Sequence, residues 1–163
     1  MAKIKSIFKE ILIGVSLLFI VSNIISYIRK PSLEQELIPT EPFTLLDGTT
    51  YQIEEGKPLL IHFWATWCKV CSVEASNIER ISKHYNVLTI AVQSGDKETI
   101  QAHMKKEHIT FKVVDDAAAI WARRFHVRAY PTDFIYDAKG RLFSSDVGYT
   151  STAGLLARMK LAE

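Results

Sequence analysis

The sequence holds little cysteine, little excess charge and no surplus of proline or glycine. Only two cysteines occur in 163 residues, which argues against a small secreted domain stapled by several disulfides. The formal net charge is only +2, and no dense basic block interleaved with aromatics is present, so no nucleic-acid partner is expected. Hydrophobic residues make up 48% of the chain, which excludes a wholly disordered protein. The length suits one globular domain with an appendage.

A long apolar run lies near the N-terminus. Residues 11–28 read ILIGVSLLFIVSNIISYI and carry no charge. A helix of this length covers about 27 Å, close to the hydrocarbon thickness of a bilayer. A cleaved signal peptide would have a shorter apolar core and small residues before a cut site, and a buried core helix would show a polar face. We therefore expect a retained, single transmembrane helix.

Charges flanking the run indicate its orientation. Three lysines and the amino terminus precede it, whereas two basic residues follow it. The positive-inside rule therefore favours a cytoplasmic location for residues 1–10. Residues 29–42 contain three prolines and are typical of a semi-extended linker. The remaining domain, residues 43–163, is then expected outside the cytoplasm, where protein disulfides are made and corrected.

Strand and helix patterns alternate along residues 43–163. The continuous apolar run at 59–64 is typical of a strand buried on both faces. From 70 to about 85, apolar residues recur at helical spacing and predict a buried helix face formed by Val70, Val73, Ile78 and Ile81. We expect further strands at 43–46, 50–53, 87–92, 111–114, 132–136 and 142–147, and further helices at 98–108, 117–125 and 152–161, the last with Ser151 as its N-cap. The alternation predicts an α/β domain with a mixed sheet.

The two cysteines form a C-x-x-C pair, Cys68 and Cys71, at the junction between the strand at 59–64 and the helix that follows. Unpaired N–H groups and the helix dipole stabilise a thiolate at such a position, and Lys69 adds positive charge. We expect Cys68 to be the exposed nucleophile with a lowered pKa, and Cys71 to resolve the mixed disulfide. The alternative is a metal-binding or structural pair. A closed zinc site needs four ligands, and the five histidines show no ligand spacing, so no metal is expected.

Two motifs resemble those of thioredoxin-like proteins. FWATWCKVC, at 63–71, is similar to the active-site segment of that family, and RAYPT, at 128–132, resembles the loop that carries its cis-proline. The anchored layout, the front hairpin and the αβ segment between 93 and 114 resemble the TlpA/ResA/DsbE branch. Within it, WATWCxVC is most similar to ScsD-like membrane-anchored protein disulfide oxidoreductases. The resemblance implies a thioredoxin-like three-layer sandwich with a mixed central sheet, an N-terminal β-hairpin and an αβ insertion.

The resemblance also implies which residues bind substrate. Pro131 is implied to be cis, which would turn the backbone of Tyr130 toward the cysteines. Backbone groups there could pair with an extended substrate strand. Trp67, Tyr130, Pro131 and Thr132 are therefore the expected substrate-binding residues. In the simpler alternative, Pro131 only begins the strand at 132–136.

Two titratable residues are candidate proton relays. Glu74 follows Cys71 by one helical turn, and ResA-like proteins similarly carry an acid there, near the buried cysteine. The alternative is a solvated first-turn acid favoured by the helix dipole. His62 occupies the strand position where ordinary thioredoxins carry a buried aspartate. A buried neutral imidazole could relay a proton, or it could be a hydrogen-bonded core residue.

These features together predict a thiol–disulfide oxidoreductase on the outer side of the bacterial cytoplasmic membrane. The resemblance implies that it reduces or isomerises protein disulfides, is recharged by a membrane thiol electron donor, and serves copper tolerance as the ScsD-like proteins do. No cofactor is expected beyond the Cys68–Cys71 disulfide. The competing interpretation is a membrane-anchored copper chaperone of the Sco type. Such chaperones share the architecture but use C-x-x-x-C with a distal His.

Overall fold

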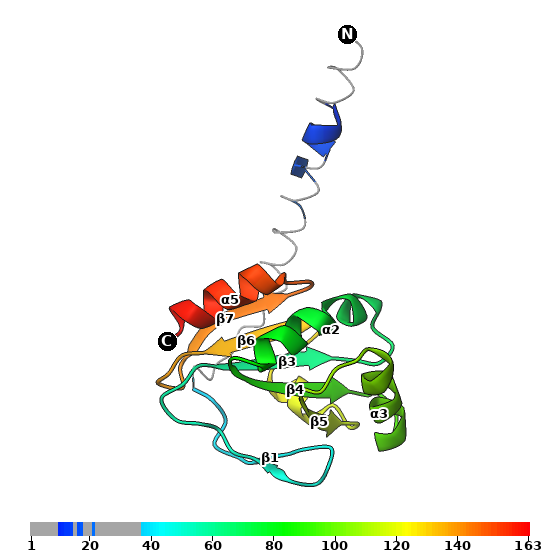
Figure 1. Cartoon of the computed structure of the whole chain (residues 1–163), viewed down its shortest axis with the longest axis vertical. Helices are drawn as coiled ribbons and strands as arrows, with labels where there is room; N and C mark the ends of the chain where they lie inside the picture. The colour runs from blue at the N-terminus through cyan, green and yellow to red at the C-terminus, as the bar shows by residue number, and fades with distance from the viewer. Residues whose placement is uncertain (1–9, 15, 18–20, 22–36) are drawn as a thin grey trace. The chain divides into compact units, whose positions relative to one another are not determined.

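The computed structural model describes residues 10–14, 16–17, 21 and 37–163 (Figure 1). The predicted membrane span at 11–28 therefore lies partly outside the described residues, as does most of the predicted linker. The described residues of the span are helical, and the side chains of Ile11, Leu12 and Leu17 are exposed. Within the described part of the chain, no helix is both long enough and apolar enough to cross a bilayer.

A five-stranded mixed sheet with the order β5-β4-β3-β6-β7 forms the centre of the domain (Figure 1). Its strands are β3 (Leu59–Trp64), β4 (Asn86–Val92), β5 (Lys112–Asp116), β6 (Thr132–Tyr136) and β7 (Leu142–Val147). Strand β3 pairs in parallel with β4 and antiparallel with β6, and all of its residues are buried. A separate antiparallel hairpin is formed by β1 (Phe43–Thr44) and β2 (Thr50–Tyr51). The predicted mixed sheet and front hairpin are confirmed.

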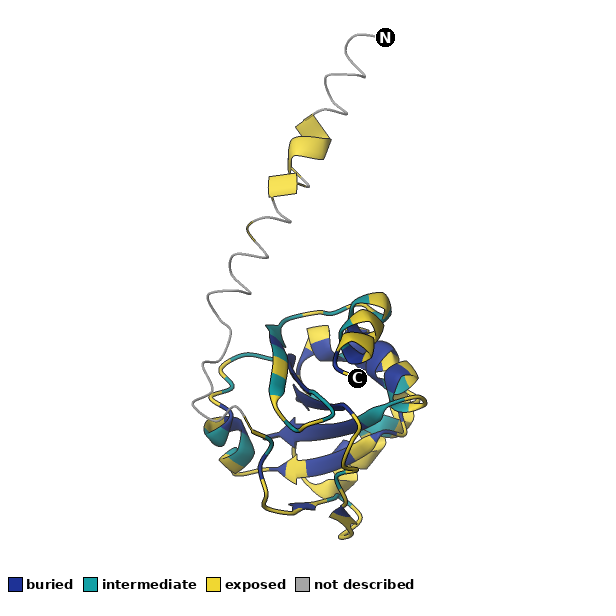
Figure 2. Cartoon of the chain, turned by 90° about the vertical axis from the view of Figure 1, so that its left-hand side faces the viewer, coloured by how far each residue is buried: buried dark blue, intermediate teal, exposed yellow. Residues whose placement is uncertain are grey.

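Helices and the hairpin cover the two faces of this sheet, so that the strands form the buried middle layer (Figure 2). The helices are α2 (Lys69–Ser82), α3 (Lys97–Lys106), α4 (Ile120–Arg124) and α5 (Thr152–Leu161). Side chains of β3 alternate between the faces, as the pleat requires. Leu60 and Trp64 belong to the core cluster that includes residues of α2, α3 and α5, whereas Ile61 and Phe63 belong to the cluster with α4 and the hairpin. We call these two sides the α2 face and the α4 face.

Helix α2 buries only part of the face that its apolar residues predict, because Ile78 and Ile81 are buried but two valines are not. Val70 and Val73 are 46% and 68% exposed. The buried stripe instead includes Cys71, Glu74 and Ala75, which continue to Ile78 at spacings of three and four residues. The two valines lie on a neighbouring side of the helix, and a charged residue takes a core position. The predicted buried face is therefore confirmed for Ile78 and Ile81 and wrong for Val70 and Val73.

Most element bounds follow the sequence pattern, and α4 is the main exception. Strands β3, β6 and β7 and helix α5 have the predicted limits, and Ser151 caps α5 by accepting the N–H of Gly154 at 3.2 Å. Helix α4 begins at Ile120 instead of 117. Ala119 has a left-handed backbone with φ 53°, and the carboxylate of Asp116 accepts the N–H of Ile120 at 2.7 Å. The capping acid comes from the end of a strand, which the helical pattern alone did not indicate.

Candidate active site

The cysteine pair lies where β3 ends and α2 begins. Cys68 is the N-cap residue of α2, with an extended backbone, and its Sγ accepts the N–H of Cys71 at 3.2 Å. The carbonyl of Cys68 accepts the N–H of Ser72, also at 3.2 Å. The sulfur thus faces unpaired N–H groups of the first helical turn, where negative charge is stabilised. This is the position that the sequence predicts.

Cys68 and Cys71 are joined by a disulfide, with their Cα atoms 5.3 Å apart. The sequence predicts an exposed Cys68, but in this oxidised form both cysteines are buried, with 7% and 3% of their surface exposed. The two cysteines therefore differ little in exposed surface in this form. Cys68 still lies at the N-cap of α2, whereas Cys71 lies within the helix.

Trp67 and the proline loop form the surroundings of the pair. Trp67 is 61% exposed, and its indole N–H donates to the carbonyl of Gln93 at 3.1 Å. The Trp67 ring meets the Tyr130 ring edge-on, with centroids 5.6 Å apart. The Tyr130–Pro131 peptide bond is cis, as the resemblance implies. The structure therefore brings three of the four expected substrate-binding residues into one neighbourhood.

The proline loop is fastened to its surroundings by hydrogen bonds. The carbonyl of Pro131 accepts the N–H of Gly148 at 2.9 Å, and the Thr132 hydroxyl donates to the carbonyl of Ala129 at 2.8 Å. Thr132 begins β6, and it pairs with Phe63 of β3 in the sheet. The loop is therefore held against the strand that leads to Cys68.

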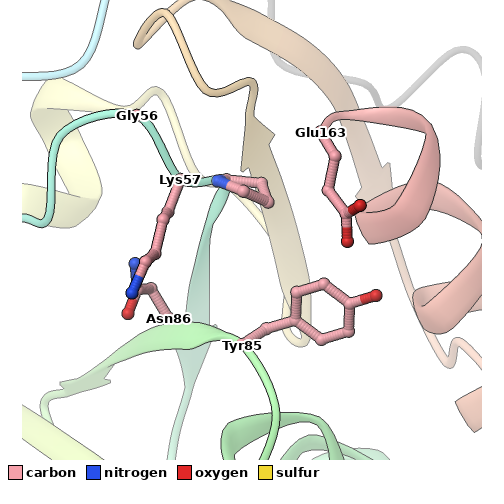
Figure 3. Close-up of a pocket in the computed structure, with 6 residues that line it drawn as sticks. Gly56, Lys57, Tyr85, Asn86 and Glu163 are labelled. Carbon is pink, nitrogen blue, oxygen red and sulfur yellow. The ribbon is translucent and has the colours of Figure 1, made fainter.

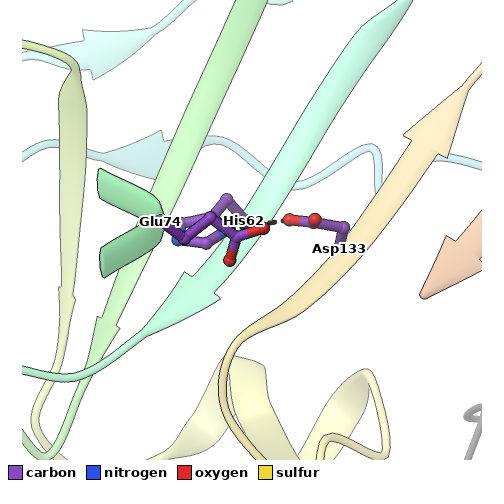
Figure 4. Close-up of side chains that lie close together, drawn as sticks. All are labelled: His62, Glu74 and Asp133. Atoms are coloured by element: carbon purple, nitrogen blue, oxygen red, sulfur yellow. Dashed lines mark hydrogen bonds and ion pairs between the residues drawn. The ribbon is translucent and has the colours of Figure 1, made fainter. Parts of the chain in front are cut away.

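A cluster of three ionisable side chains is buried on the α2 face (Figure 4). His62 comes from β3, Glu74 from α2 and Asp133 from β6. His62 Nδ1 and Asp133 Oδ1 are 2.7 Å apart, and Glu74 Oε1 accepts the N–H of Thr150 at 2.6 Å. The second carboxylate oxygens, Glu74 Oε2 and Asp133 Oδ2, have no hydrogen-bond partner among the described residues. Buried oxygens of this kind are uncommon and call for an explanation.

Burial and neighbouring charge shift the pKa of two members of this cluster. The pKa of Glu74 is raised to about 8, chiefly by burial and then by the charge of Asp133, against the opposing effects of His62 and of the Thr150 N–H. For His62, burial is the largest influence and lowers the pKa. The hydrogen bond and charge of Asp133, together with the charge of Glu74, outweigh it and leave the pKa of His62 raised. Glu74 therefore holds a proton near neutral pH, while the neighbouring carboxyl groups favour the charged form of His62.

The cluster decides between the alternatives that the sequence leaves open. Glu74 is buried, so the solvated first-turn acid is wrong. His62 is a hydrogen-bonded core residue, and its partner Asp133 is the residue that sequence reasoning missed. Asp133 lies two residues after Pro131 and has the same strand parity as the buried positions of β6 on the α2 face. That parity, combined with the β3–β6 register in which His62 faces Asp133, could have identified it.

The same three residues are the described set that could hold a metal ion, because their ligand atoms lie within 4.8 Å of one another. The scattered histidines in the sequence gave no sign of it. The set offers three ligands where a closed zinc site takes four. In addition, His62 already bonds directly to Asp133. The geometry therefore fits a proton-holding cluster better than a closed metal site.

A hollow of about 300 Å³ lies at the opposite end of the sheet from the cysteines (Figure 3). It is lined by residues that precede β3 and begin β4, and by the last residue of the chain: Gly56, Lys57, Pro58, Tyr85, Asn86 and Glu163. None of the residues expected at the site lines it. The reactive centre is therefore the disulfide and its surroundings, not this pocket.

Comparison with known proteins agrees with this geometry. Residues 39–144 match the model of the AhpC/TSA family. A thioredoxin-like protein of Haemophilus influenzae is 30% identical, over 99% of this chain and 98% of its own length. The thiol–disulfide oxidoreductase ResA of Bacillus cereus is 26% identical, over 68% of this chain and 67% of its own length.

Among solved structures, a secreted Mycobacterium tuberculosis disulfide oxidoreductase, described as homologous to E. coli DsbE, has a similar fold. It superposes with a TM-score of 0.65 at 24% identity and covers 74% of this chain and 95% of its own. At this identity the likeness concerns the fold alone. With the Cys68–Cys71 disulfide at the head of α2, these matches identify the chain as a thiol–disulfide oxidoreductase of the thioredoxin-like AhpC/TSA family, in the TlpA/ResA/DsbE branch.

Proposed function

We propose that this protein reduces or isomerises disulfides of other proteins on the outer side of a bacterial cytoplasmic membrane. The observation that carries the proposal is the position of Cys68, which caps α2 and whose sulfur accepts the N–H of Cys71. A thiolate formed there on reduction is stabilised by the helix terminus, and the thiolate is the form that attacks disulfides.

The proposed location rests on the N-terminal segment. The described residues of the span at 11–28 are helical, and their apolar side chains are exposed. An exposed apolar helix followed by a linker suits an anchor in the bilayer. The fold is also shared with a secreted relative. We place the amino terminus inside, the domain outside, and a thiol electron donor in the same membrane.

The exchange proceeds in two steps. The Cys68 thiolate attacks one sulfur of the substrate disulfide, forms a mixed disulfide and expels the other substrate sulfur as a thiolate. Cys71 then loses its proton and attacks the Cys68 sulfur. The Cys68–Cys71 disulfide forms, and the second substrate thiolate leaves. The substrate gains two electrons, and the membrane donor later returns two electrons to the protein. Glu74 is the proposed carrier of the Cys71 proton, assisted by the imidazole of His62.

Substrate binding is assigned to the surface around the outer cysteine. Trp67 is exposed there and Tyr130 is half-buried, whereas Pro131 and Thr132 are buried. An extended substrate segment could therefore meet the proline loop through the backbone beside Pro131. Trp67 offers an exposed aromatic face next to the reactive sulfur. Large exposed aromatics of this kind contribute much of the binding energy at protein interfaces.

A role in copper tolerance would fit an enzyme that repairs disulfides formed in error. The competing function is that of a Sco-type chaperone, which binds copper directly. The spacing of the pair favours the enzyme, because C-x-x-C places both sulfurs within one helical turn and within bonding distance. Two assays on the full chain in detergent separate the functions. The protein should catalyse repeated reduction of insulin disulfides when a dithiol donor is present. The reduced protein should not bind Cu(I) tightly. Tight Cu(I) binding without turnover would favour the chaperone.

The substrate class is tested by trapping partners in cells. The Cys71→Ala variant should accumulate mixed disulfides through Cys68, because the resolving thiol is absent. The Cys68→Ala variant is the matched control and should accumulate none. Recovery of extracytoplasmic proteins that contain cysteine pairs would support the proposal. Equal yields from the two variants would contradict it.

A further inference from the structure

Asp133 has no role in the exchange described so far, yet it is fully buried and pairs with His62. Its Oδ1 is 2.7 Å from His62 Nδ1, and its Oδ2 has no partner among the described residues. Glu74 completes the cluster from α2, so that one ligand atom from each of the three side chains lies within 4.8 Å of the others (Figure 4). The arrangement raises the question of how many protons the three groups hold.

The charge count requires one proton beyond that of the imidazole. If both carboxyl groups were ionised, the buried cluster would keep an unbalanced negative charge, which is costly in a protein interior. Asp133 already has a partner in the cluster, because its Oδ1 lies 2.7 Å from His62 Nδ1. Glu74 accepts the Thr150 N–H through Oε1, which leaves Oε2 to carry the proton. The raised pKa of Glu74 agrees with this count.

Within the described part of the chain, no element that packs around the cluster supplies a second positive charge to it. Strand β4 carries no charged residue, and α2 places its Lys69 and Arg80 in exposed positions. From α5, Arg158 pairs instead with Asp146 of β7, with 3.1 Å between Nε and Oδ2. The loop at 148–151 contributes backbone N–H and hydroxyl groups only. His62 is therefore the cation against which both carboxyl groups must be balanced.

We propose that Asp133 is a positioning residue for disulfide exchange, which by binding His62 makes Glu74 the proton carrier that serves Cys71. The inference rests on the proposed function. Glu74 lies one helical turn after Cys71, and both belong to the buried stripe of α2. Asp133 itself touches neither sulfur nor substrate in this scheme. It acts through the ionisation state of its two neighbours.

The proton then moves between Glu74 and Cys71 in step with the sulfur chemistry. When a donor thiolate attacks Cys68, the Cys68–Cys71 bond breaks and Cys71 leaves as a thiolate. It takes the proton from Glu74, which becomes a carboxylate. During oxidation of the protein by substrate, Cys71 returns this proton to Glu74 and attacks the mixed disulfide. Electrons and protons balance over one cycle, and the proton held in the core need not be exchanged with solvent.

The test measures how fast the mixed disulfide is resolved at different pH values. Oxidised glutathione is added to the reduced full chain in detergent, and the release of the second glutathione is followed from pH 5 to 9. Asp133→Asn leaves Glu74 as the one carboxylate beside His62, so the half-maximal pH should fall by about one unit or more. His62→Gln removes the cation and should shift it upward. Asp115→Asn, an exposed substitution on β5, should leave the profile unchanged.

Opposite shifts in the two variants would support the proposal, because a purely structural defect would slow both without moving their profiles apart. Unchanged profiles, or shifts in the same direction, would overturn it. Failure of the wild-type protein to react with glutathione at all would instead overturn the proposed function.

A second measurement needs no variant of Asp133. Infrared difference spectra of the oxidised minus the reduced wild-type protein at pH 7 should contain the C=O band of a protonated carboxyl group. Glu74→Gln should remove that band, and Asp115→Asn should not. Absence of the band from the wild-type spectrum would overturn the assignment even if Asp133→Asn fails to fold.

Discussion

The two faces of the central sheet both bury carboxylates, but they satisfy them differently. On the α4 face, the Asp116 carboxylate accepts three N–H groups at the start of α4, those of Ile120, Trp121 and Ala122, at 2.7, 3.2 and 2.9 Å. On the α2 face, Glu74 and Asp133 each keep one oxygen without a partner among the described residues. Both oxygens of Asp116 therefore accept hydrogen bonds from the start of a helix. Glu74 and Asp133 each have one oxygen at which a proton can bind.

This difference separates a structural role from a chemical one. A buried carboxylate whose oxygens all accept hydrogen bonds contributes to stability. A buried carboxylate with an unpartnered oxygen destabilises the fold when ionised, and its pKa rises. Perturbed groups of the second kind are characteristic of functional sites. The α2 face is also the face on which Cys71 is buried.

The largest effect on stability should come from the α4 face. We expect Asp116→Ala to lower the free energy of unfolding by about 3 kcal/mol, because it removes several charge-assisted hydrogen bonds to a helix terminus. Disulfide exchange per folded molecule should remain near the wild-type rate. Urea unfolding gives the first quantity, and glutathione exchange on the same sample gives the second. If Asp116→Ala had the same free energy of unfolding as the wild type, the structural role assigned to this carboxylate would be contradicted.

Glu74→Gln is expected to change the free energy of unfolding in the opposite direction, as the pH rises. Burial raises the pKa of Glu74 from 4.5 to about 8, so between these values the unfolded chain is ionised while the folded chain is not. Rising pH therefore favours unfolding of the wild type, by at most about 1.4 kcal/mol per pH unit. Glutamine does not titrate, so the stability of the variant relative to that of the wild type should rise as the pH rises from 4.5 to about 8.

Urea unfolding of the oxidised wild type and of Glu74→Gln from pH 4 to 9 measures this gain. The difference in stability should be flat below about pH 4.5, rise up to about pH 8 and be flat again above it. Glu98→Gln, an exposed substitution on α3, controls for the loss of a charge. A constant difference between the two proteins across this range would show that Glu74 is ionised in both states.

The smallest effect on activity is expected outside the core, at an exposed aromatic residue beside the cysteines. Trp67→Ala removes the ring that meets Tyr130 edge-on beside the cysteines. We expect KM for a peptide disulfide to rise about fivefold, which corresponds to about 1 kcal/mol, while kcat changes little. Phe143→Ala, near the start of β7 and also exposed, is the matched control. Equal effects of the two substitutions would argue against a substrate contact at Trp67.

The sequence was most informative where a single periodicity governs an element. The bounds of β3 follow from a continuous apolar run, and the cysteine pair is located by its place between a strand and a helix. Prediction failed where the outcome depends on contacts across the fold. The buried stripe of α2 depends on how the helix is rotated against the sheet, so the exposed Val70 and Val73 resembled core residues.

The cluster was only half visible for the same reason. His62 and Glu74 could be singled out by their distance from the cysteines along the chain. Asp133 could not, because its pairing with His62 depends on the antiparallel register of β3 and β6. Two strands separated by about half the chain must be aligned before the two side chains are seen to meet. Local patterns contain no information of this kind.

The account depends above all on Cys68 being ionised at the head of α2 in the reduced protein. Alkylation by iodoacetamide, followed over pH with each modified cysteine identified by mass spectrometry, measures this directly. We expect Cys68 to react first and rapidly near pH 7, with Cys71 protected. An unperturbed thiol has a pKa slightly above 8. If neither thiol reacted below about pH 8, the helix terminus would not activate the sulfur, and the proposed exchange chemistry would be contradicted.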